Sequence, residues 1–559
     1  MADQHAPLRD AVARHRAGDI AGALTGYQGI LQHQPDHAPA RHGEGLALEA
    51  LGRLTDALAA LRRAAAAPPA SALHQFNLAR IEARCGHPDQ AEAAYRTSVA
   101  IKPDFADSWN NLGLLLEADH RQEDAIGALQ QAVRVAPDHG VARINLARLL
   151  CAQRRRGEAE AVLAPVLTLE NAPAEAHFLA GTLHEAEQRF AEAITCYKSA
   201  LARDPGFDKA RNNIGTSRLG LHDYDGARDT FLTLFREHRG VADNDPGTFC
   251  AQDWEGSGSV IQTCRERLEN LALQLRYLCT EGKLGPSWED AAQRIDAAIA
   301  DHDVRGLDPA LPHAMSGPAI DAMAGLHERA IRFEDIDLDD GTAIGASNDY
   351  RTIEQGYLAS PTSVTVIDDF LSPEALFEIR RFCLESTVFF GHNATGYVTS
   401  YMADGFACSL LYRIAAELQQ AMPRVLGGRQ LHNMWVYRHR SEGAGVDAHT
   451  DDASVTFNFW ITDDEACLDP EHGGLIVYAK EQPLDWDWND INLRKNAPDV
   501  KTRIDGFLAD ANPITLKHRS NRAVLFHSNL FHKSDRFRFR EGIENRRTNI
   551  TLLFGERGA

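Results

Sequence analysis

A period of 34 residues runs through the first 240 positions and constrains the fold more than any other feature of the sequence. Three kinds of residue keep this step: a small residue, an alanine, and a large apolar residue. The small residues are Ala11, Gly45, Ala79, Gly113, Ala147, Gly181 and Gly215, the alanines are Ala23, Ala57, Ala91, Ala125, Ala159, Ala193 and Ala227, and the large residues are Tyr27, Leu61, Tyr95, Leu129, Leu163, Tyr197 and Phe231. Such a repeat is one supersecondary unit that buries its apolar face only against neighbouring units.

Proline closes most of the units. It stands at Pro35, Pro69, Pro103, Pro137 and Pro205, and Asn171 occupies the expected place in the fifth unit. Proline cannot continue a helix without a clash, so it ends the second of two antiparallel helices. The pattern, which includes Trp109-x-x-Leu112-Gly113, resembles the tetratricopeptide repeat. The resemblance implies seven units over residues 1–238, forming a right-handed superhelix with a concave groove.

Four asparagines share the same 34-residue step. Asn77, Asn111, Asn145 and Asn213 each fall two positions before the small residue of the first helix, while Leu179 breaks the series. An amide donates and accepts at once, so a row of amides can bind the main chain of an extended peptide. The series resembles the asparagine ladder in the repeat region of the O-linked N-acetylglucosamine transferase. The alternative is that these amides only cap, pack or face water.

The C-terminal third carries a possible metal site. His449 and Asp451 lie two residues apart and project from the same side of an extended segment, and His532 follows further along. Two histidines and one carboxylate are the ligands of non-heme Fe(II) oxygenases, which leave three metal positions open. Short β-prone runs surround these residues, at 434–437, 454–460, 523–526 and 550–554. The pattern therefore predicts an oxygenase site on consecutive strands.

The stretch from about Val364 to Phe554 resembles the 2-oxoglutarate/Fe(II)-dependent oxygenases, especially the prolyl-hydroxylase-like branch. The matching motifs are Val366 to Ser372, His449-Thr450-Asp451, Leu530-Phe531-His532 and Glu544 to Thr551. The resemblance implies a double-stranded β-helix, or jelly roll, with His449, Asp451 and His532 as iron ligands. It also implies that Arg547 binds the distal carboxylate of 2-oxoglutarate. Family members oxidise a C–H bond with O2 and convert 2-oxoglutarate to succinate and CO2.

Each assignment has a rival. Asp452 is next to Asp451, but in an extended segment it points to the opposite side from His449. His527 is a second possible far ligand, which the resemblance disfavours, and Arg546 competes with Arg547 for the barrel interior. A planar guanidinium suits bidentate carboxylate binding.

Other residues of the same strands are candidates to line the pocket. Thr456, Asn458 and Trp460 share one strand face, and Tyr437 can offer its hydroxyl to the cosubstrate. Ordinary barrel packing is the alternative for these residues.

The retained carboxylate bears on the reaction. Halogenating relatives in the wider family replace this residue with a small one to admit chloride, and some two-histidine β-hydroxylases lack it. This chain has Asp451. Hydroxylation is therefore the expected reaction, although desaturation, demethylation and ring closure use the same ligands.

Length and composition agree with several domains. A chain of 559 residues is too long to fold around a single hydrophobic core. The net charge is −21 and no basic run is long enough for a nucleic-acid footprint, so nucleic acid is not expected as a partner. The nine cysteines include no Cys-x-x-Cys pair, which indicates reduced thiols. No apolar run approaches the length that a membrane span requires, and the N-terminus does not resemble a signal peptide. The sequence therefore predicts a cytoplasmic protein with no membrane contact.

Residues 239–360 are expected to form a helical connector. Helical spacing of apolar residues covers 259–284, 288–302 and 319–333, and the run from Leu338 to about Pro361 reads mostly as loop. A further helix is expected over Leu371 to Leu384, with Ser372 as its N-cap and Pro373 in its first position.

The sequence as a whole predicts a multidomain α + β protein: repeats over 1–238, a connector over 239–360 and a jelly roll over 361–559. The expected function is an Fe(II)/2-oxoglutarate-dependent dioxygenase that hydroxylates a protein or peptide recruited by the groove. Its cofactor would be Fe(II), and its cosubstrates 2-oxoglutarate and O2. Two alternatives stay open. One is a small-molecule tailoring oxygenase whose repeats serve docking or assembly, and the other is a repeat scaffold with a vestigial oxygenase domain.

Overall fold

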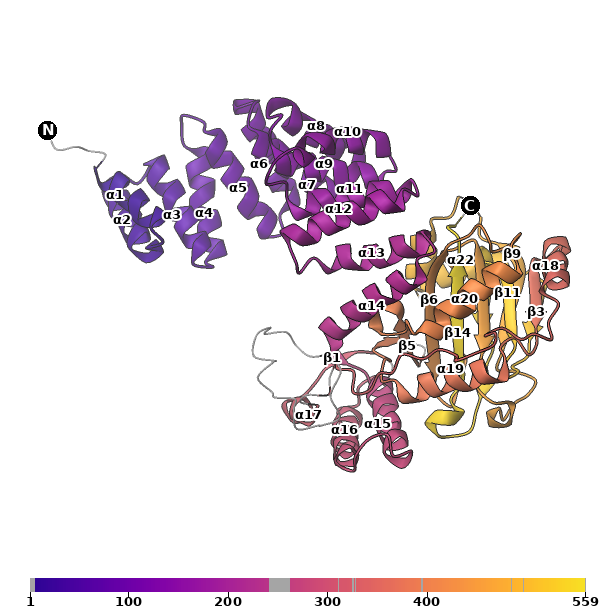
Figure 1. The fold of residues 1–559 in the computed structure, drawn as a ribbon. Helices are drawn as coiled ribbons and strands as arrows, with labels where there is room; N and C mark the ends of the chain where they lie inside the picture. Colours follow the sequence, from indigo (N-terminus) through magenta and orange to yellow (C-terminus); the bar gives the residue numbers. More distant parts are fainter. Residues whose placement is uncertain are drawn as a thin grey trace. The chain divides into compact units, whose positions relative to one another are not determined.

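The computed structural model describes residues 6–240 and 262–557, except for residues 310, 324, 325, 327, 394, 395, 484 and 496. The chain folds into two compact units, Met1–Phe207 and Asp208–Ala559. Figure 1 shows a first unit made of helices and a second unit that contains the strands.

Twelve helices make up the described part of the first unit. They are α1 (Ala6–Arg16), α2 (Ile20–His33), α3 (Ala38–Ala50), α4 (Leu54–Ala66), α5 (Ala72–Arg84), α6 (Pro88–Ile101), α7 (Ala106–Ala118), α8 (Gln122–Val135), α9 (Gly140–Ala152), α10 (Arg156–Leu167), α11 (Ala174–Ala186) and α12 (Phe190–Arg203). Each odd-numbered helix packs against the next even-numbered one. The paired helices predicted from the 34-residue period are therefore confirmed in this region.

The small residues of the repeat stand where two helices approach closely. A Cβ atom added to Gly113 would lie 2.7 Å from Leu129 Cγ, and one added to Gly181 would lie 2.4 Å from the Tyr197 ring. Both distances are too short for carbon atoms that are not bonded, so a larger side chain would push the helices apart. The repeat alanines are fully buried, as Ala125 and Ala193 illustrate.

The seventh helix pair belongs to the second compact unit. Helices α13 (Asp208–Gly220) and α14 (Tyr224–Arg239) keep the repeat pattern. The Tyr224 hydroxyl donates to the Gln419 side chain on α20 (Ser409–Ala421), and the Arg228 guanidinium donates to Ser409 Oγ over 2.8 Å. Phe235 packs within 5.2 Å of Phe333 in the core of the unit. The second compact unit therefore begins at Asp208, whereas the sequence placed the end of the repeats at residue 238, one residue before α14 ends.

The connector contains β1 (Gln262–Thr263), α15 (Arg265–Thr280), α16 (Ser287–Val304), β2 (His313–Ala314) and α17 (Gly317–Ala322). The helices expected over 259–284 and 288–302 correspond to α15 and α16, although residues 259–261 lie outside the described residues. The helix expected over 319–333 is wrong beyond Ala322. There, the amides of Ala330 and Ile331 donate to Arg239 O and Thr387 Oγ1 instead of forming helical bonds.

A further helix, α18 (Tyr350–Ala359), forms where the sequence predicted a loop. The Asp349 carboxylate caps its N-terminus by accepting from the Thr352 amide. The expected helix that follows is confirmed as α19 (Pro373–Glu385), with the Ser372 hydroxyl accepting from the Ala375 amide and Pro373 in the first turn.

Two antiparallel sheets form the centre of the second unit. The larger runs in the order β3 (Val364–Ile367), β11 (Ala523–His527), β8 (Val455–Trp460), β14 (Thr548–Phe554), β6 (Leu431–His439), β5 (Tyr397–Tyr401) and β4 (Gly391–Asn393). The smaller runs β10 (Pro513–Leu516), β9 (Leu475–Glu481) and β12 (Leu530–Ser534), and β7 (Glu442–Gly443) pairs with β13 (Phe537–Arg538). The predicted C-terminal region of antiparallel strands is confirmed.

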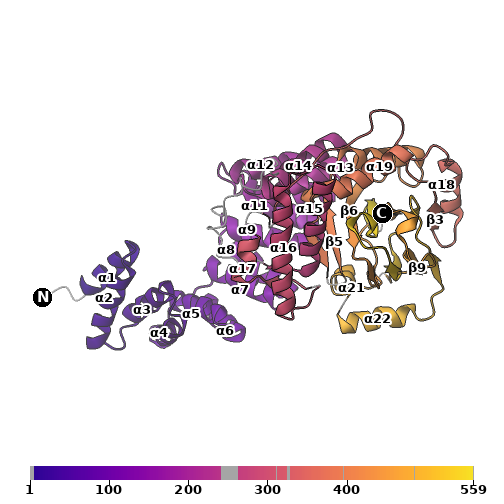
Figure 2. The ribbon, with the colours of Figure 1, turned by 90° about the horizontal axis from the view of Figure 1, so that it is seen from below.

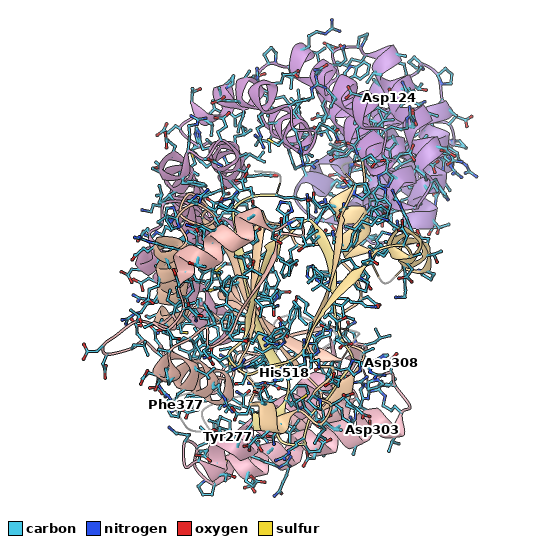
Figure 3. All side chains as sticks on the ribbon, turned by 90° about the vertical axis from the view of Figure 1, so that its right-hand side faces the viewer. Asp124, Tyr277, Asp303, Asp308, Phe377 and His518 are labelled. Atoms are coloured by element: carbon cyan, nitrogen blue, oxygen red, sulfur yellow. The ribbon has the colours of Figure 1, made fainter. Side chains whose placement is uncertain are left out.

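The larger sheet buries both faces. Phe457 and Phe459 of β8 point to a core shared with α19 and α20, which lie across that face in Figure 1. Trp460, together with Val524 and Phe526 of β11, packs against the smaller sheet. His518, which follows β10, contacts Phe539 and Trp460 edge-on and lies among the strands in Figure 3. The two sheets therefore enclose a second interior, which holds the candidate site.

An insertion of two helices separates β9 from β10. Helices α21 (Trp488–Leu493) and α22 (Pro498–Leu508) lie on the opposite side of the strands from α19 in Figure 2. Ile491, Val500 and Ile504 pack onto Phe531, the residue before His532. The insertion is thereby fixed beside the candidate site.

Candidate metal centre

His449, Asp451 and His532 converge in the second interior. Their potential ligand atoms all lie within 4.8 Å of one another. His449 Nε2 is 3.9 Å from Asp451 Oδ1, and His532 Nε2 is 3.5 Å from Asp451 Oδ2. Within the described ranges, these three residues form the one group of histidine, cysteine or carboxylate side chains with this geometry.

Backbone pairing brings the two histidines together. His449 and His532 form an isolated antiparallel bridge, in which the amide of each donates to the carbonyl of the other over 3.0 and 2.9 Å. Residues directly opposite in such a pair project to the same side. The ring centroids are accordingly 4.3 Å apart.

Both imidazoles present the same nitrogen to the site. His449 Nδ1 lies 2.8 Å from Asp447 O, and His532 Nδ1 lies 3.1 Å from Leu530 O. Because a carbonyl only accepts, each Nδ1 carries a proton, and in the neutral ring the lone pair lies on Nε2. Burial, with Lys495 and His532 nearby, also lowers the pKa of His449 well below its usual value. The neutral form is the one that binds metals.

Asp451 is held by its neighbours. Its Oδ2 accepts from Thr456 Oγ1 over 2.7 Å, and its amide donates to Ser528 O over 3.0 Å. The side chain is 6% exposed, whereas Asp452 faces solvent. The structure thus brings Asp451, and not Asp452, to the two histidines, as the period of an extended strand requires.

The rival histidine is elsewhere. His527 ends β11 and its Nδ1 lies 3.7 Å from a Glu481 carboxylate oxygen, with about a third of the side chain exposed. It is not part of the converging group.

The two rival arginines point to opposite sides of the sheet. Arg546 Nη2 donates to Glu269 of α15 over 2.5 Å, on the helical side. Arg547 points to the second interior, where its Nε donates to Gly473 O, its Nη1 to Asn549 Oδ1 and its Nη2 to Gly474 O, over 2.7 to 3.1 Å. No carboxylate is within ion-pair distance of Arg547 among the described residues, and burial lowers its pKa to about 10.

The predicted pocket residues also face this interior. Thr456 reaches Asp451, and Asn458 Nδ2 donates to Thr551 Oγ1 over 2.8 Å. Among the described residues, Asn458 Oδ1 and the indole nitrogens of Trp460 and Trp435 are buried without a hydrogen-bond partner. Burial raises the pKa of Tyr437, with Tyr397 and Tyr401 beside it, so its phenol is neutral. Unpartnered buried polar atoms are costly in a finished core and favour a bound group.

His439 is a residue of this kind that the sequence did not single out. It is fully buried on β6 opposite Tyr397, with both ring nitrogens unpartnered within the part of the chain that the structure describes. Burial and the nearby Arg547 lower its pKa well below the usual value, so the imidazole is neutral. Only the pairing of β6 with β14 places it near Arg547.

The insertion and the C-terminal segment add residues that sequence reasoning missed. Asn492 Oδ1 accepts from the Thr450 amide over 2.9 Å, and Gln482 Oε1 accepts from Thr450 Oγ1 over 2.8 Å. Lys495 lies close enough to interact electrostatically with His449 and Asp451. Arg557 Nη1 reaches Thr450 Oγ1 over 3.4 Å. No motif marks these residues, because only the folding of the insertion and of the C-terminal segment brings them to the site.

The asparagine series is engaged within the protein. Asn77 Nδ2 bonds His42 Nε2 and Leu73 O, and its Oδ1 accepts from Arg80. Asn145 donates to Asn110, which donates to Asn111. These amides therefore interact with one another and with neighbouring side chains, and Asn77 has both of its donors in use. Asn213 belongs to the second unit.

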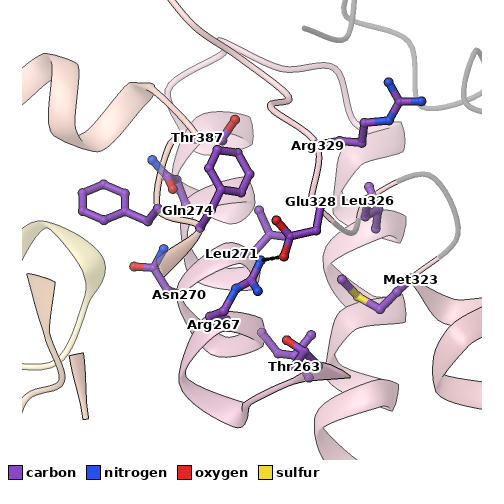
Figure 4. Close-up of a pocket in the computed structure, with 13 residues that line it drawn as sticks. Thr263, Arg267, Asn270, Leu271, Gln274, Met323, Leu326, Glu328, Arg329 and Thr387 are labelled. Carbon is purple, nitrogen blue, oxygen red and sulfur yellow. Dashed lines mark ion pairs between the residues drawn. The ribbon is translucent and has the colours of Figure 1, made fainter. Parts of the chain in front are cut away.

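A separate cavity lies between the connector and residues 387–390. Figure 4 shows Arg267 and Glu328 joined by an ion pair of 2.6 Å across it, with Asn270, Gln274 and Met323 nearby. Its volume of about 30 Å³ holds no more than about two waters. It is too small for a substrate.

Family models for the tetratricopeptide repeat match residues 9–72, 76–140, 116–180 and 174–207. The N-terminal region therefore consists of tetratricopeptide repeats. No protein with a curated function matches the sequence.

Several solved structures resemble part of the chain. One is pilF of Pseudomonas aeruginosa, at 22% identity over 36% of this chain and 91% of that chain, with a TM-score of 0.33. Another is YrrB, described as a repeat protein with an unusual peptide-binding site, at 18% identity over 33% and 95%, with a TM-score of 0.29. The Cut9–Hcn1 tetramer of the APC/C matches at 18% identity over 38% of this chain and only 42% of that chain, with a TM-score of 0.33.

No helix in the described ranges combines the length and the apolar character that crossing a bilayer requires.

Proposed function

We propose that the second unit is a mononuclear non-heme Fe(II) oxygenase that uses 2-oxoglutarate, built on a jelly roll, and that it hydroxylates a protein or peptide recruited by the repeats. The observation that carries this proposal is the convergence of His449, Asp451 and His532 in the largely buried interior between two sheets. Two imidazoles and one carboxylate match the ligand set of such oxygenases.

The donor geometry fits an octahedral cation. Metal–ligand bonds of about 2.1 Å would place neighbouring donors about 3 Å apart. The separations of 3.5 and 3.9 Å, which involve the two different carboxylate oxygens, and the upper limit of 4.8 Å for the whole group are longer, so the side chains would move closer together around a bound cation. The same ligands also accept manganese, cobalt or zinc. When bound with its cosubstrates, ferrous iron would supply the oxidising chemistry, while the protein orients the reactants and excludes water.

Arg547 supports the assignment of 2-oxoglutarate as the diacid. Three of its five N–H donors bond the protein, which leaves one on Nη1 and one on Nη2 for a carboxylate. Gly474 lies three residues along the chain from Val477, which pairs with His532. At about 3.3 Å per residue, Arg547 is roughly 10 Å from the ligand level, a separation that a short diacid can span.

The side chains between these two ends include groups suited to a bound diacid. The neutral Tyr437 phenol and the unpartnered indole nitrogens can donate, and Asn458 can donate or accept. Hydroxylation is the proposed reaction because Asp451 is present, whereas the halogenating relatives lack this carboxylate.

Recruitment of the substrate is assigned to the repeats, since tetratricopeptide repeat proteins generally bind peptides or proteins. Asn111 and Asn145 are partly exposed and are the better candidates for contact with a main chain. Asn77 would have to give up one of its hydrogen bonds within the protein to bind a peptide main chain.

The decisive experiment measures succinate formation by the full chain with Fe(II), 2-oxoglutarate and pooled cellular peptides, followed by mass spectrometry. We expect succinate release together with a gain of one oxygen on specific peptides. Proteins trapped on a variant that carries His449→Ala and Asp451→Ala would identify the substrate. Metal and 2-oxoglutarate binding without any peptide oxidation would favour a small-molecule substrate. Absence of metal binding would leave a repeat scaffold.

A further inference from the structure

The charges around the candidate metal centre leave one cation without a counterion, and this argument rests on the proposed function. A divalent metal and Arg547 bring three positive charges, which Asp451 and the two carboxylates of 2-oxoglutarate balance. Lys495 then remains. Within the described residues it makes no hydrogen bond and no ion pair, although it is partly buried and interacts with His449 and Asp451.

The carboxylates near Lys495 are already committed. Asp447 accepts from Lys501 Nζ over 3.0 Å, and Asp451 would bind the metal. The other carboxylate at this edge, Asp452, is exposed and interacts with Arg557. A lysine ammonium that is partly withdrawn from water needs an anionic partner, because desolvating a charge without one costs free energy.

The position of Lys495 is built by the fold. It follows α21 in the turn before α22, three residues after Asn492, which accepts from the Thr450 amide between the two ligands of the His449 segment. Lys501 ties the other side of the turn to Asp447, two residues before His449. The insertion is thus bonded to the ligand segment on both sides, which fixes the turn that carries Lys495 beside the site.

We propose that Lys495 binds a carboxylate of the substrate at the open side of the metal centre. His449 marks that side, since 15% of its side chain is exposed, compared with 6% and 7% for Asp451 and His532. The substrate class is therefore an acidic one, in which the carboxylate belongs either to an aspartate or glutamate side chain or to the end of a peptide chain. This assignment is opposite to what the net charge of −21 alone would suggest, which is a basic partner.

The test uses the full chain loaded with Mn(II) and 2-oxoglutarate, because Mn(II) broadens the NMR signals of ligands that bind close to it. Three probes are titrated: acetyl-aspartate N-methylamide, acetyl-asparagine as the free acid, and the neutral acetyl-asparagine N-methylamide. We expect a carboxylate probe to bind about tenfold more tightly than the neutral probe, as one charge-assisted hydrogen bond provides. Preference for the first probe indicates a side-chain carboxylate, and preference for the second indicates a chain end.

Variants show whether Lys495 causes the preference for the carboxylate probes. In Lys495→Met the preference should disappear, and in Lys495→Arg it should stay within about threefold of the wild type. Lys517→Met, which removes an exposed lysine paired with Glu471, is the control for net charge and should change nothing. Equal binding of all three probes, or a preference that persists in Lys495→Met, would overturn the proposal.

Measurements of Mn(II) binding and of 2-oxoglutarate binding distinguish a failure of this proposal from a failure of the proposed function. If Lys495→Met loses 2-oxoglutarate while keeping the metal, Lys495 belongs to the cosubstrate, and the substrate assignment is wrong although the oxygenase stands. If the wild type binds neither Mn(II) nor 2-oxoglutarate, the oxygenase assignment itself is wrong.

Discussion

Asp451 Oδ2 lies 3.5 Å from His532 Nε2, and the backbone bridge between His449 and His532 holds the second histidine in that position. If these atoms bind a metal, His532→Ala should lower the affinity for Fe(II) or Mn(II) at least about 100-fold, since even residues outside the ligand set contribute about 10- to 100-fold. Calorimetry under anoxic conditions would measure this change.

His527→Ala is the matched control for that experiment. It removes a nearby histidine that takes no part in the converging group, so metal affinity should stay within about twofold of the wild type. Loss of metal in His527→Ala with retention in His532→Ala would show that the ligand assignment is wrong.

The Thr456 hydroxyl orients Asp451 through its 2.7 Å hydrogen bond. Thr456→Val keeps the shape of the side chain and removes the donor. We expect metal affinity to fall about 10-fold, as for other residues that orient a ligand. Thr462→Val is the control, because its buried hydroxyl bonds Arg546 O and no ligand. Unchanged metal affinity in Thr456→Val would argue against a bound Asp451.

Arg547 should govern the binding of 2-oxoglutarate. In the Mn(II)-loaded protein, Arg547→Gln should weaken 2-oxoglutarate binding by about 2 to 3 kcal/mol, or roughly 30- to 150-fold, while metal affinity is retained. Arg547 also bonds Gly473 and Gly474, so thermal unfolding must confirm that the variant folds, and Arg547→Lys provides a milder variant.

Arg546→Gln is the companion control. It removes the ion pair with Glu269 on the helical side of the sheet and should leave 2-oxoglutarate affinity intact. Similar losses in both arginine variants would indicate a general disturbance of β14 instead of a carboxylate site.

Two glycines of the repeats should respond to alanine in opposite directions. Gly181→Ala would place a methyl group 2.4 Å from the Tyr197 ring and should destabilise the first unit by about 1 to 3 kcal/mol. Gly127→Ala in α8 meets nothing within 4 Å and should stabilise it by about 0.5 to 1 kcal/mol. Hydrogen exchange of the repeat amides measures both effects. Equal effects would contradict the close helix approach at Gly181.

The free energy of unfolding of the repeats should fall in acid because of the protonation of His42. Burial, with His74 and His15 nearby, lowers the pKa of His42 to about 4, and its Nε2 lies 2.9 Å from the Asn77 amide nitrogen. Below about pH 6.5 the unfolded chain binds a proton that the folded chain does not, so stability falls between pH 6.5 and 4 by about 3 kcal/mol.

Hydrogen exchange of α3 and α5, corrected for the intrinsic pH dependence, would detect this loss. His42→Gln should reduce the difference between pH 7 and pH 4.5, while His33→Gln on the exposed end of α2 should preserve it. A difference of the same size in His42→Gln would assign the effect to another group.

Local patterns in the sequence predicted the elements that are stabilised by their own residues. The 34-residue period predicted the helix pairs, since small residues such as Gly113 are needed wherever two helices approach. The cap formed by Ser372 and Pro373 predicted α19, and the alternation after Asp451 predicted β8. The helix expected over 319–333 failed because long-range partners, such as Thr387 Oγ1, take the backbone amides there.

The sequence by itself determined the repeat architecture and singled out His449 and Asp451, because both depend on residue type at a fixed spacing. Only the tertiary structure decided which of His527 and His532 faces Asp451, since that choice depends on a bridge between distant segments. It also decided that α13 and α14 pack with the C-terminal unit and that Lys495 reaches the site. Packing of segments far apart in the chain sets these relationships, and no local period of residues records it.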